Sequence, residues 1–271
     1  MTSLVTTRRG GSGTPQVVFL HGLLGQGKNW ATIADGVADQ GPSLLLDLPH
    51  HGRSPWTGDL DHVTMADQVA ATLRSTLPPA TSIAVVGHSM GGKVAMVLAL
   101  RHPDLVRGLV VVDIAPDDSS HGYGFARLIG ALRDLDLAAV HRRSDADALL
   151  AASIPDPDTR GFLLQNLQRT PQGWRWRVNL DLIAERLPRI SGWPVGVHGT
   201  YDGPTLWLRG SDSGYVRSEH APVMRRFFPR ALLVTIKGAG HWVHADRPEA
   251  VTAALRSFLT GLGPALRPGP A

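Results

Sequence analysis

The chain has 271 residues, of which 43% are hydrophobic and 18% are charged, and its formal net charge is +4. This length suffices for one large core, and no apolar run approaches the roughly 18 residues that a membrane-spanning helix needs. The absence of cysteine excludes disulfides, thiolate nucleophiles and thiolate metal sites, and the scattered arginines, with no run of five like charges, indicate no nucleic-acid-binding stripe.

The N-terminal segment 1–13 is polar and lacks an apolar secretory stretch, so we expect a cytoplasmic protein. Farther along, short apolar runs bounded by Gly, Pro and Asp alternate with stretches of helical periodicity. This alternation predicts an α/β fold with a mostly parallel sheet and helices on both faces. The expected strands, each buried on both faces because it is short and uninterrupted, are 17–20, 43–46, 82–86, 108–112, 205–209 and 232–236.

His21-Gly22-Leu23-Leu24-Gly25 directly follows the first expected strand. A loop at the carboxyl end of a strand can aim backbone N–H groups at a developing negative charge. Leu23 is the first choice for this role and Leu24 the second, while His21 is expected to brace the loop through a hydrogen bond. The alternative is an ordinary glycine-rich turn between strand and helix.

The loop after the second strand carries Asp47, His50, His51 and Arg53. We expect Asp47 and Arg53 to lock the loop as an ion pair, a structural role in preference to a catalytic one. The paired histidines could suggest a metal, but adjacent side chains point apart and no acidic cluster at ligand spacing accompanies them. We therefore expect no metal site here.

Gly87-His88-Ser89-Met90-Gly91 stands between the third strand and an apolar helix expected over 92–100. A G-x-S-x-G turn in that setting forces the serine into a strained, exposed backbone position, and the helix N-terminus directs amides toward its hydroxyl. We expect Ser89 to be a nucleophile and the N–H of Met90 to belong to an oxyanion hole. The alternative is a glycine-rich turn with a helix-capping serine.

The segment 116–194 departs from the alternation, because it shows recurrent helix signals and no convincing buried strand. Helices are expected to begin near Ser144 and near Asp156 or Asp158, and another to run over 180–187. We interpret the segment as an all-helical cap, or lid, over the strand ends.

The cap would divide the core into 1–115 and 195–261, with a disordered tail over 262–271. Three tryptophans lie in the cap, Trp174, Trp176 and Trp193. They could line an acyl pocket or pack the lid onto the core.

His241 lies in a short loop after the last expected strand, before a helix that begins after Pro248. Such a loop lies at the carboxyl ends of the strands, beside the serine turn, and a late histidine fits the chain order serine, acid, histidine. A serine hydroxyl is a weak nucleophile until a base takes its proton, so His241 is expected to be that base. His244 is a less favoured competitor.

The acid that orients His241 has two candidates. In the superfamily that these motifs resemble, the acid usually stands three residues after a glycine that ends the strand before the last; counted from Gly210, that place holds Ser213, and Asp212 is one position early. One residue reverses the side-chain direction along an extended stretch, so Asp212 is expected to face away and Ser213 to act as a hydrogen-bonding helper. Asp113, at the end of the strand 108–112, is the other carboxylate.

Four motifs together resemble the α/β-hydrolase superfamily: the HGLLG loop, the D-x-x-x-H-G-R-S turn, the GHSMGGKVAM turn and helix, and the late AGHWVH segment. More narrowly, the chain from about residue 17 to 259 resembles the YbfF-like bacterial esterases and the animal abhydrolase-domain-11 proteins. The resemblance implies an eight-stranded sheet with a helical cap and hydrolysis of esters, with acyl-thioesters as a further substrate class. The YbfF-like pattern carries serine at the place of Ser213 and aspartate at the place of Asp113, which favours Asp113 as the acid.

These observations predict a serine hydrolase that cleaves small-molecule carboxylic esters through an acyl-enzyme and needs no cofactor. The expected triad is Ser89, His241 and Asp113, and the expected oxyanion hole is formed by Leu23 and Met90. The same fold and triad also support cofactor-free perhydrolysis (haloperoxidase activity), C–C bond hydrolysis or amide cleavage. Outside enzymes, the alternative is a receptor-like binding module that retains the triad. The sequence carries no signal for the oligomeric state.

Overall fold

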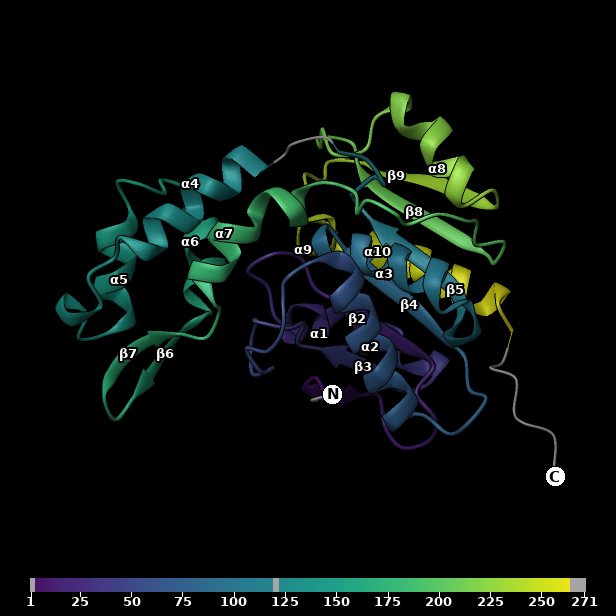
Figure 1. Cartoon of the computed structure of the whole chain (residues 1–271), viewed down its shortest axis with the longest axis horizontal. Coiled ribbons are helices and arrows are strands. Elements are labelled where there is room, and N and C mark those ends of the chain that lie inside the picture. Colours follow the sequence, from purple (N-terminus) through teal and green to yellow (C-terminus); the bar gives the residue numbers. More distant parts are fainter. Residues whose placement is uncertain (1–2, 119–121, 264–271) are drawn as a thin grey trace.

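Seven strands form the central sheet of the computed structural model, which describes residues 3–118 and 122–263 (Figure 1). Their order across the sheet is β1-β3-β2-β4-β5-β8-β9, and every pair is parallel except β1 with β3. The expected α/β architecture is confirmed. The expected count of eight strands is wrong for the described residues, where the sheet has seven strands and ends at β1 and β9. The strands are β1 (Thr6–Arg9), β2 (Val17–Leu20), β3 (Ser43–Leu46), β4 (Ile83–His88), β5 (Val106–Val112), β8 (Thr205–Gly210) and β9 (Ala231–Ile236).

Helices cover both faces of the sheet because successive side chains of each strand point to opposite sides. On one face, Val18 and Leu20 of β2 belong to a core shared with α2 and α3. On the other face, Val17 and Phe19 pack in a second core with α1 and α10. The helices of the sheet-forming parts are α1 (Ala31–Gly36), α2 (His62–Thr76), α3 (Met90–Arg101), α8 (Ala221–Phe227), α9 (Val243–Asp246) and α10 (Pro248–Gly261).

The last strand differs from the prediction that every strand is buried on both faces. Leu232 of β9 is 68% exposed, and Leu233 and Val234 are exposed as well. The reason is position: in the part of the chain that the structure describes, β9 lies at the edge of the sheet and pairs with β8 alone. An apolar run cannot by itself distinguish an edge strand from a central one.

The segment between β5 and β8 folds to one side of the sheet (Figure 1). The expected all-helical character is wrong, because β6 (Leu167–Thr170) and β7 (Gly173–Trp176) form an antiparallel hairpin there. These strands are only four residues long and mix polar with aromatic side chains, so they carry no buried-strand signal. The helices are α4 (Gly122–Arg133), α5 (Arg143–Leu150), α6 (Pro157–Leu164) and α7 (Leu180–Ser191).

Both ends of this inserted segment are tied to α3 by Lys93. Its buried ammonium donates to the carbonyl oxygens of Asp117 at 2.8 Å, Ser191 at 2.7 Å and Gly192 at 3.0 Å. All three donors of the ammonium are thus used. Burial lowers the pKa of Lys93 to about 8.

Two further points concern the ends of the chain and its helices. The tail expected to be disordered lies outside the described residues from position 264 onward. Across 3–118 and 122–263, every helix is too short or too polar to cross a lipid bilayer.

Candidate active site

Ser89 lies in the tight turn between β4 and α3, with a positive φ of 52°. Its N–H donates to the carbonyl oxygen of Val112 on β5 at 3.0 Å, which holds the turn against the neighbouring strand. Gly91 must be glycine, because a Cβ there would lie 2.4 Å from the carbonyl oxygen of His21. The sequence therefore forces a left-handed serine at the carboxyl edge of the sheet, a strain typical of functional positions.

A continuous hydrogen-bond chain runs from Ser89 to a buried carboxylate. The Oγ of Ser89 lies 3.0 Å from Nε2 of His241, and Nδ1 of His241 lies 2.9 Å from Oδ2 of Asp113. Asp113 is fully buried, so its ionised carboxylate must be stabilised by polar contacts within the protein. The imidazole is therefore held with one nitrogen toward the carboxylate and the other toward the hydroxyl.

Two further groups satisfy the Asp113 carboxylate. The backbone N–H of Gly210 donates to Oδ1 at 3.0 Å, and the hydroxyl of Ser213 donates to Oδ2. Asp212 lies elsewhere: it is exposed, and its carboxylate accepts a hydrogen bond from Ser211 at 2.8 Å. The structure thus brings Asp113 to His241, directs the Ser213 hydroxyl to the same carboxylate and leaves Asp212 exposed.

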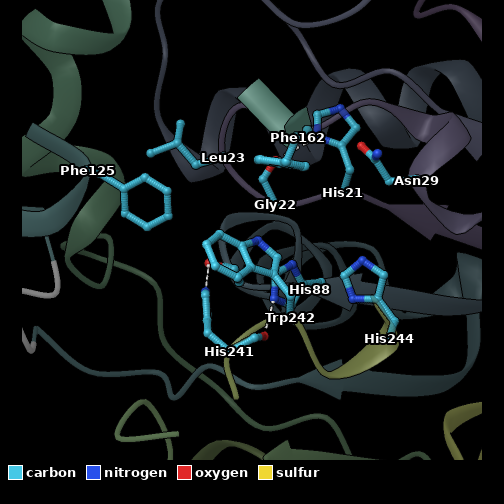
Figure 2. Close-up of a pocket in the computed structure, with 12 residues that line it drawn as sticks. His21, Gly22, Leu23, Asn29, His88, Phe125, Phe162, His241, Trp242 and His244 are labelled. Atoms are coloured by element: carbon cyan, nitrogen blue, oxygen red, sulfur yellow. Dashed lines mark hydrogen bonds between the residues drawn. The ribbon is translucent and has the colours of Figure 1, made fainter. Parts of the chain in front are cut away.

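The loop after β2 packs directly on the serine turn. A Cβ on Gly22 would lie 2.7 Å from Nδ1 of the buried His88 and 3.3 Å from Cβ of Ser89, so glycine allows this close approach. Leu23 and Met90 line one small cavity together with Ser89. Met90 is the first residue of α3, where the backbone N–H groups lack intrahelical acceptors. Figure 2 shows Gly22 and Leu23 facing His241 and Trp242 across the pocket.

The imidazole that pairs with Ser89 is His241, and His244 packs on Trp30. Its ring stacks on Trp30 with centroids 4.3 Å apart, and burial together with the charge of His241 lowers its pKa to about 4. The neutral His244 ring therefore helps to pack the segment that carries His241 against Trp30.

Sequence reasoning missed two residues that contact His241. His88 donates from Nε2 to the carbonyl oxygen of His241 at 2.8 Å, and burial holds the pKa of His88 well below its usual range. Tyr215 stacks on the His241 ring with centroids 3.6 Å apart and planes inclined by 16°. The place of His88 inside the G-x-S-x-G motif could have indicated that it lies near the site. Tyr215 is distant in sequence and belongs to no motif that would indicate its position.

The loop after β3 is organised by Asp47. Its carboxylate accepts the backbone N–H of Gly27 at 2.8 Å and of Arg53 at 2.9 Å, whereas the Arg53 guanidinium lies 3.8 Å away and is mostly exposed. Asp47 therefore holds the loop mainly through backbone amides. His21 braces the neighbouring loop, because its Nε2 accepts the N–H of Leu48 at 2.9 Å.

His50 and His51 are both buried in the same region. Burial lowers the pKa of His51 to about 3, so it is neutral near pH 7. Among the residues that the structure describes, no group of three His, Asp or Glu side chains is arranged to hold a metal ion.

The tryptophans of the inserted segment do not line the cavities described near Ser89. Trp174 and Trp176 lie on the β6–β7 hairpin. They are half-buried and pack against the hydrophobic core to which β2, α2 and α3 contribute. Trp193 packs on Phe227. The aromatic side chains that do line the pocket are Phe125, Phe162 and Trp242 (Figure 2). The packing interpretation therefore holds for the three tryptophans.

This geometry can carry out nucleophilic acyl chemistry. A hydroxyl, an imidazole and a buried carboxylate stand in sequence, each within hydrogen-bond reach of the next. Leu23, in the loop after β2, and Met90, at the start of α3, line the same cavity as Ser89, so their backbone amides are candidates for stabilising negative charge on a substrate oxygen.

Comparison with known proteins agrees with this arrangement. Residues 15–248 match the family described as alpha/beta hydrolase fold. The chain is 38% identical over 252 residues to the mouse protein named sn-1-specific diacylglycerol lipase ABHD11, covering 90% of this chain and 81% of that protein. It is 31% identical over 244 residues to Esterase YbfF of Escherichia coli, covering 90% and 92%. A solved structure titled marine microorganism esterase superposes with a TM-score of 0.89 at 35% identity, covering 94% of this chain and 99% of that one.

Proposed function

The chain belongs to the α/β-hydrolase fold family, and from that premise we propose that it hydrolyses carboxylic esters through an acyl-enzyme formed on Ser89. Similarity over nine-tenths of the chain to proteins named as a lipase and an esterase supports ester hydrolysis. The observation that carries the proposal is the unbroken hydrogen-bond chain from Ser89 through His241 to Asp113.

In the first half of the reaction, Nε2 of His241 takes the proton of Ser89 as Oγ attacks the ester carbonyl carbon. The carboxylate of Asp113 accepts the Nδ1–H bond, which fixes the tautomer and stabilises the imidazolium as it forms. The imidazolium then gives its proton to the departing alcohol oxygen, and the acyl group remains on Ser89.

In the second half, His241 takes a proton from water as the water oxygen attacks the acyl carbon; the bond to Oγ of Ser89 then breaks, the imidazolium returns its proton to Oγ, and the carboxylic acid leaves. In both halves the carbonyl oxygen becomes an anion, and the N–H groups of Leu23 and Met90 stabilise it. Ser213 supplies a hydrogen bond to the Asp113 carboxylate but cannot carry the charge itself. The inserted segment 116–194 acts as a cap over this site and restricts which substrates enter.

Substitution of the nucleophile tests the proposal. Ser89→Ala should lower kcat on a p-nitrophenyl ester by about 10⁴- to 10⁶-fold, and His241→Ala should cost a similar factor. The double variant should lose hardly more than either, because both changes disable one shared function. His50→Ala is the matched control and should retain most of the activity. More than a tenth of wild-type turnover in Ser89→Ala would disprove the assignment.

A further inference from the structure

Besides a cavity of about 10 Å³ that is lined by both Ser89 and His241 and holds only about one water-sized group, two cavities of very different size lie at the catalytic residues. The smaller, which we call the acyl cavity, measures about 30 Å³ and is lined by Ser89 and both oxyanion residues, but not by His241. The larger, which we call the alcohol cavity, measures about 420 Å³ and is lined by His241 and Trp242, but not by Ser89. Phe125 and Tyr215 border both.

The chemistry of the tetrahedral intermediate assigns each cavity to one half of an ester. The leaving oxygen must receive the proton on Nε2 of His241, so the alcohol extends along His241. The oxyanion points to the amides of Leu23 and Met90, and the remaining substituent is the acyl chain. That chain therefore enters the cavity that borders Ser89 without His241.

The acyl cavity is walled largely by buried side chains. Met90, Ile114 and Ile190 are all buried residues of the core, and the buried Lys93 also lines the cavity. The ammonium of Lys93 uses its three donors on carbonyl oxygens at both ends of the inserted segment, so it neither yields to a longer chain nor offers a donor to a charged acyl group. A volume of about 30 Å³ holds roughly two or three water-sized groups.

The alcohol cavity has the opposite character. Its lining is predominantly apolar, with Phe125, Leu128, Ile154, Pro155 and Trp242 among the contributors. Most of it comes from α4 and from the connection between α5 and α6, so the inserted segment shapes the alcohol side more than the acyl side.

Resting on the proposed function, we propose that this enzyme is selective for esters of short, uncharged acyl groups, of about two to four carbons, with bulky apolar alcohols. Ile190 sets the acyl limit and Leu128 contributes to the alcohol preference. The two preferences are separable because the two side chains line different cavities.

The wild-type enzyme tests this with two substrate series. Among p-nitrophenyl esters, which share one alcohol, kcat/KM should fall at least about 100-fold from butyrate to octanoate. Among alkyl acetates, whose alcohols have similar leaving-group character, kcat/KM should rise about tenfold or more from ethyl to hexyl acetate. Preference for octanoate over butyrate, or for ethyl over hexyl acetate, would overturn the inference and leave ester hydrolysis intact. Absence of turnover on every ester by the folded protein would instead overturn the proposed function.

Paired variants test the separation of the cavities. Ile190→Ala, with Ile190→Val as a milder change, should raise the octanoate-to-butyrate ratio about tenfold or more while the hexyl-to-ethyl ratio stays within about twofold. Leu128→Ala should do the reverse and lower the hexyl-to-ethyl ratio alone. If either variant shifts both ratios alike, the two cavities do not divide the substrate in this way.

Discussion

At the scale of single residues, the position of one carboxylate decides how His241 is used. Asp113 leaves the end of β5 with a positive φ of 51° and is fully buried against the histidine. Asp212 stands one position from the place where such an acid usually follows β8, and it faces solvent. The next residue, Ser213, directs its hydroxyl to the Asp113 carboxylate. A hydroxyl can stabilise that carboxylate but cannot supply its negative charge.

Neutralising each aspartate in turn should separate their roles. Asp113→Asn should lower kcat by about 10⁴-fold, because the amide keeps the shape but favours the wrong imidazole tautomer. Asp212→Asn is the matched control and should cost about tenfold or less, as should Ser213→Ala. The measurement is kcat on a short p-nitrophenyl ester, with thermal melting to verify folding. If Asp212→Asn were the more damaging of the two aspartate changes, the assignment of the acid would be reversed.

At the scale of elements, the helix that follows Ser89 also holds the inserted segment in place. Lys93 lies one turn after Ser89 on α3, and its ammonium bridges the residues where the chain leaves β5 and where α7 ends. His220, before α8, reaches the same junction, since its Nε2 lies 3.2 Å from the Asp117 carboxylate. The buried Lys93 therefore connects the helix that follows Ser89 with both ends of the inserted segment.

Removing the ammonium should loosen this support. Lys93→Met keeps a similar length but leaves three carbonyl oxygens without their charged donor, so the free energy of unfolding should fall by on the order of 3 kcal/mol. Lys237 is exposed, and Lys237→Met should change it by less than about 0.5 kcal/mol. Urea unfolding of both variants checks this. Equal stability of Lys93→Met and the wild type would show that the bridge does not support the segment.

At the scale of the whole molecule, the fold buries several histidines in their neutral form. Burial lowers the pKa of His62 to about 3, and burial with the charge of a neighbouring histidine lowers the pKa of His51 to about 3 and of His244 to about 4. In the unfolded chain each would titrate near its ordinary pKa of about 6.5. The unfolded state therefore binds more protons as the pH falls below that value.

The free energy of unfolding should accordingly decrease as the pH falls from about 6.5 toward 4, by up to about 1.4 kcal/mol per pH unit for each such histidine. Above pH 7 this contribution is fully retained. His62→Leu should reduce the slope, whereas His198→Leu, at an exposed position, should leave it unchanged. Urea unfolding at pH 7.5, 6.0 and 5.0 measures the slope, and a wild-type free energy that stays flat over this range would contradict the prediction.

The sequence by itself determined the α/β class, the parallel strands and the family, because these depend on local periodicity and on motifs contiguous in the chain. Glycines at fixed spacing around Ser89 predict a sharp turn wherever that segment lies. The resemblance favoured Asp113 over Asp212, and the tertiary structure places Asp113 against His241. Tertiary structure alone decided that Tyr215 stacks on His241, that β9 is an exposed edge and that the cavities differ in size. Each of these depends on which distant segments become neighbours, and the spacing of residues along one chain does not encode that distance.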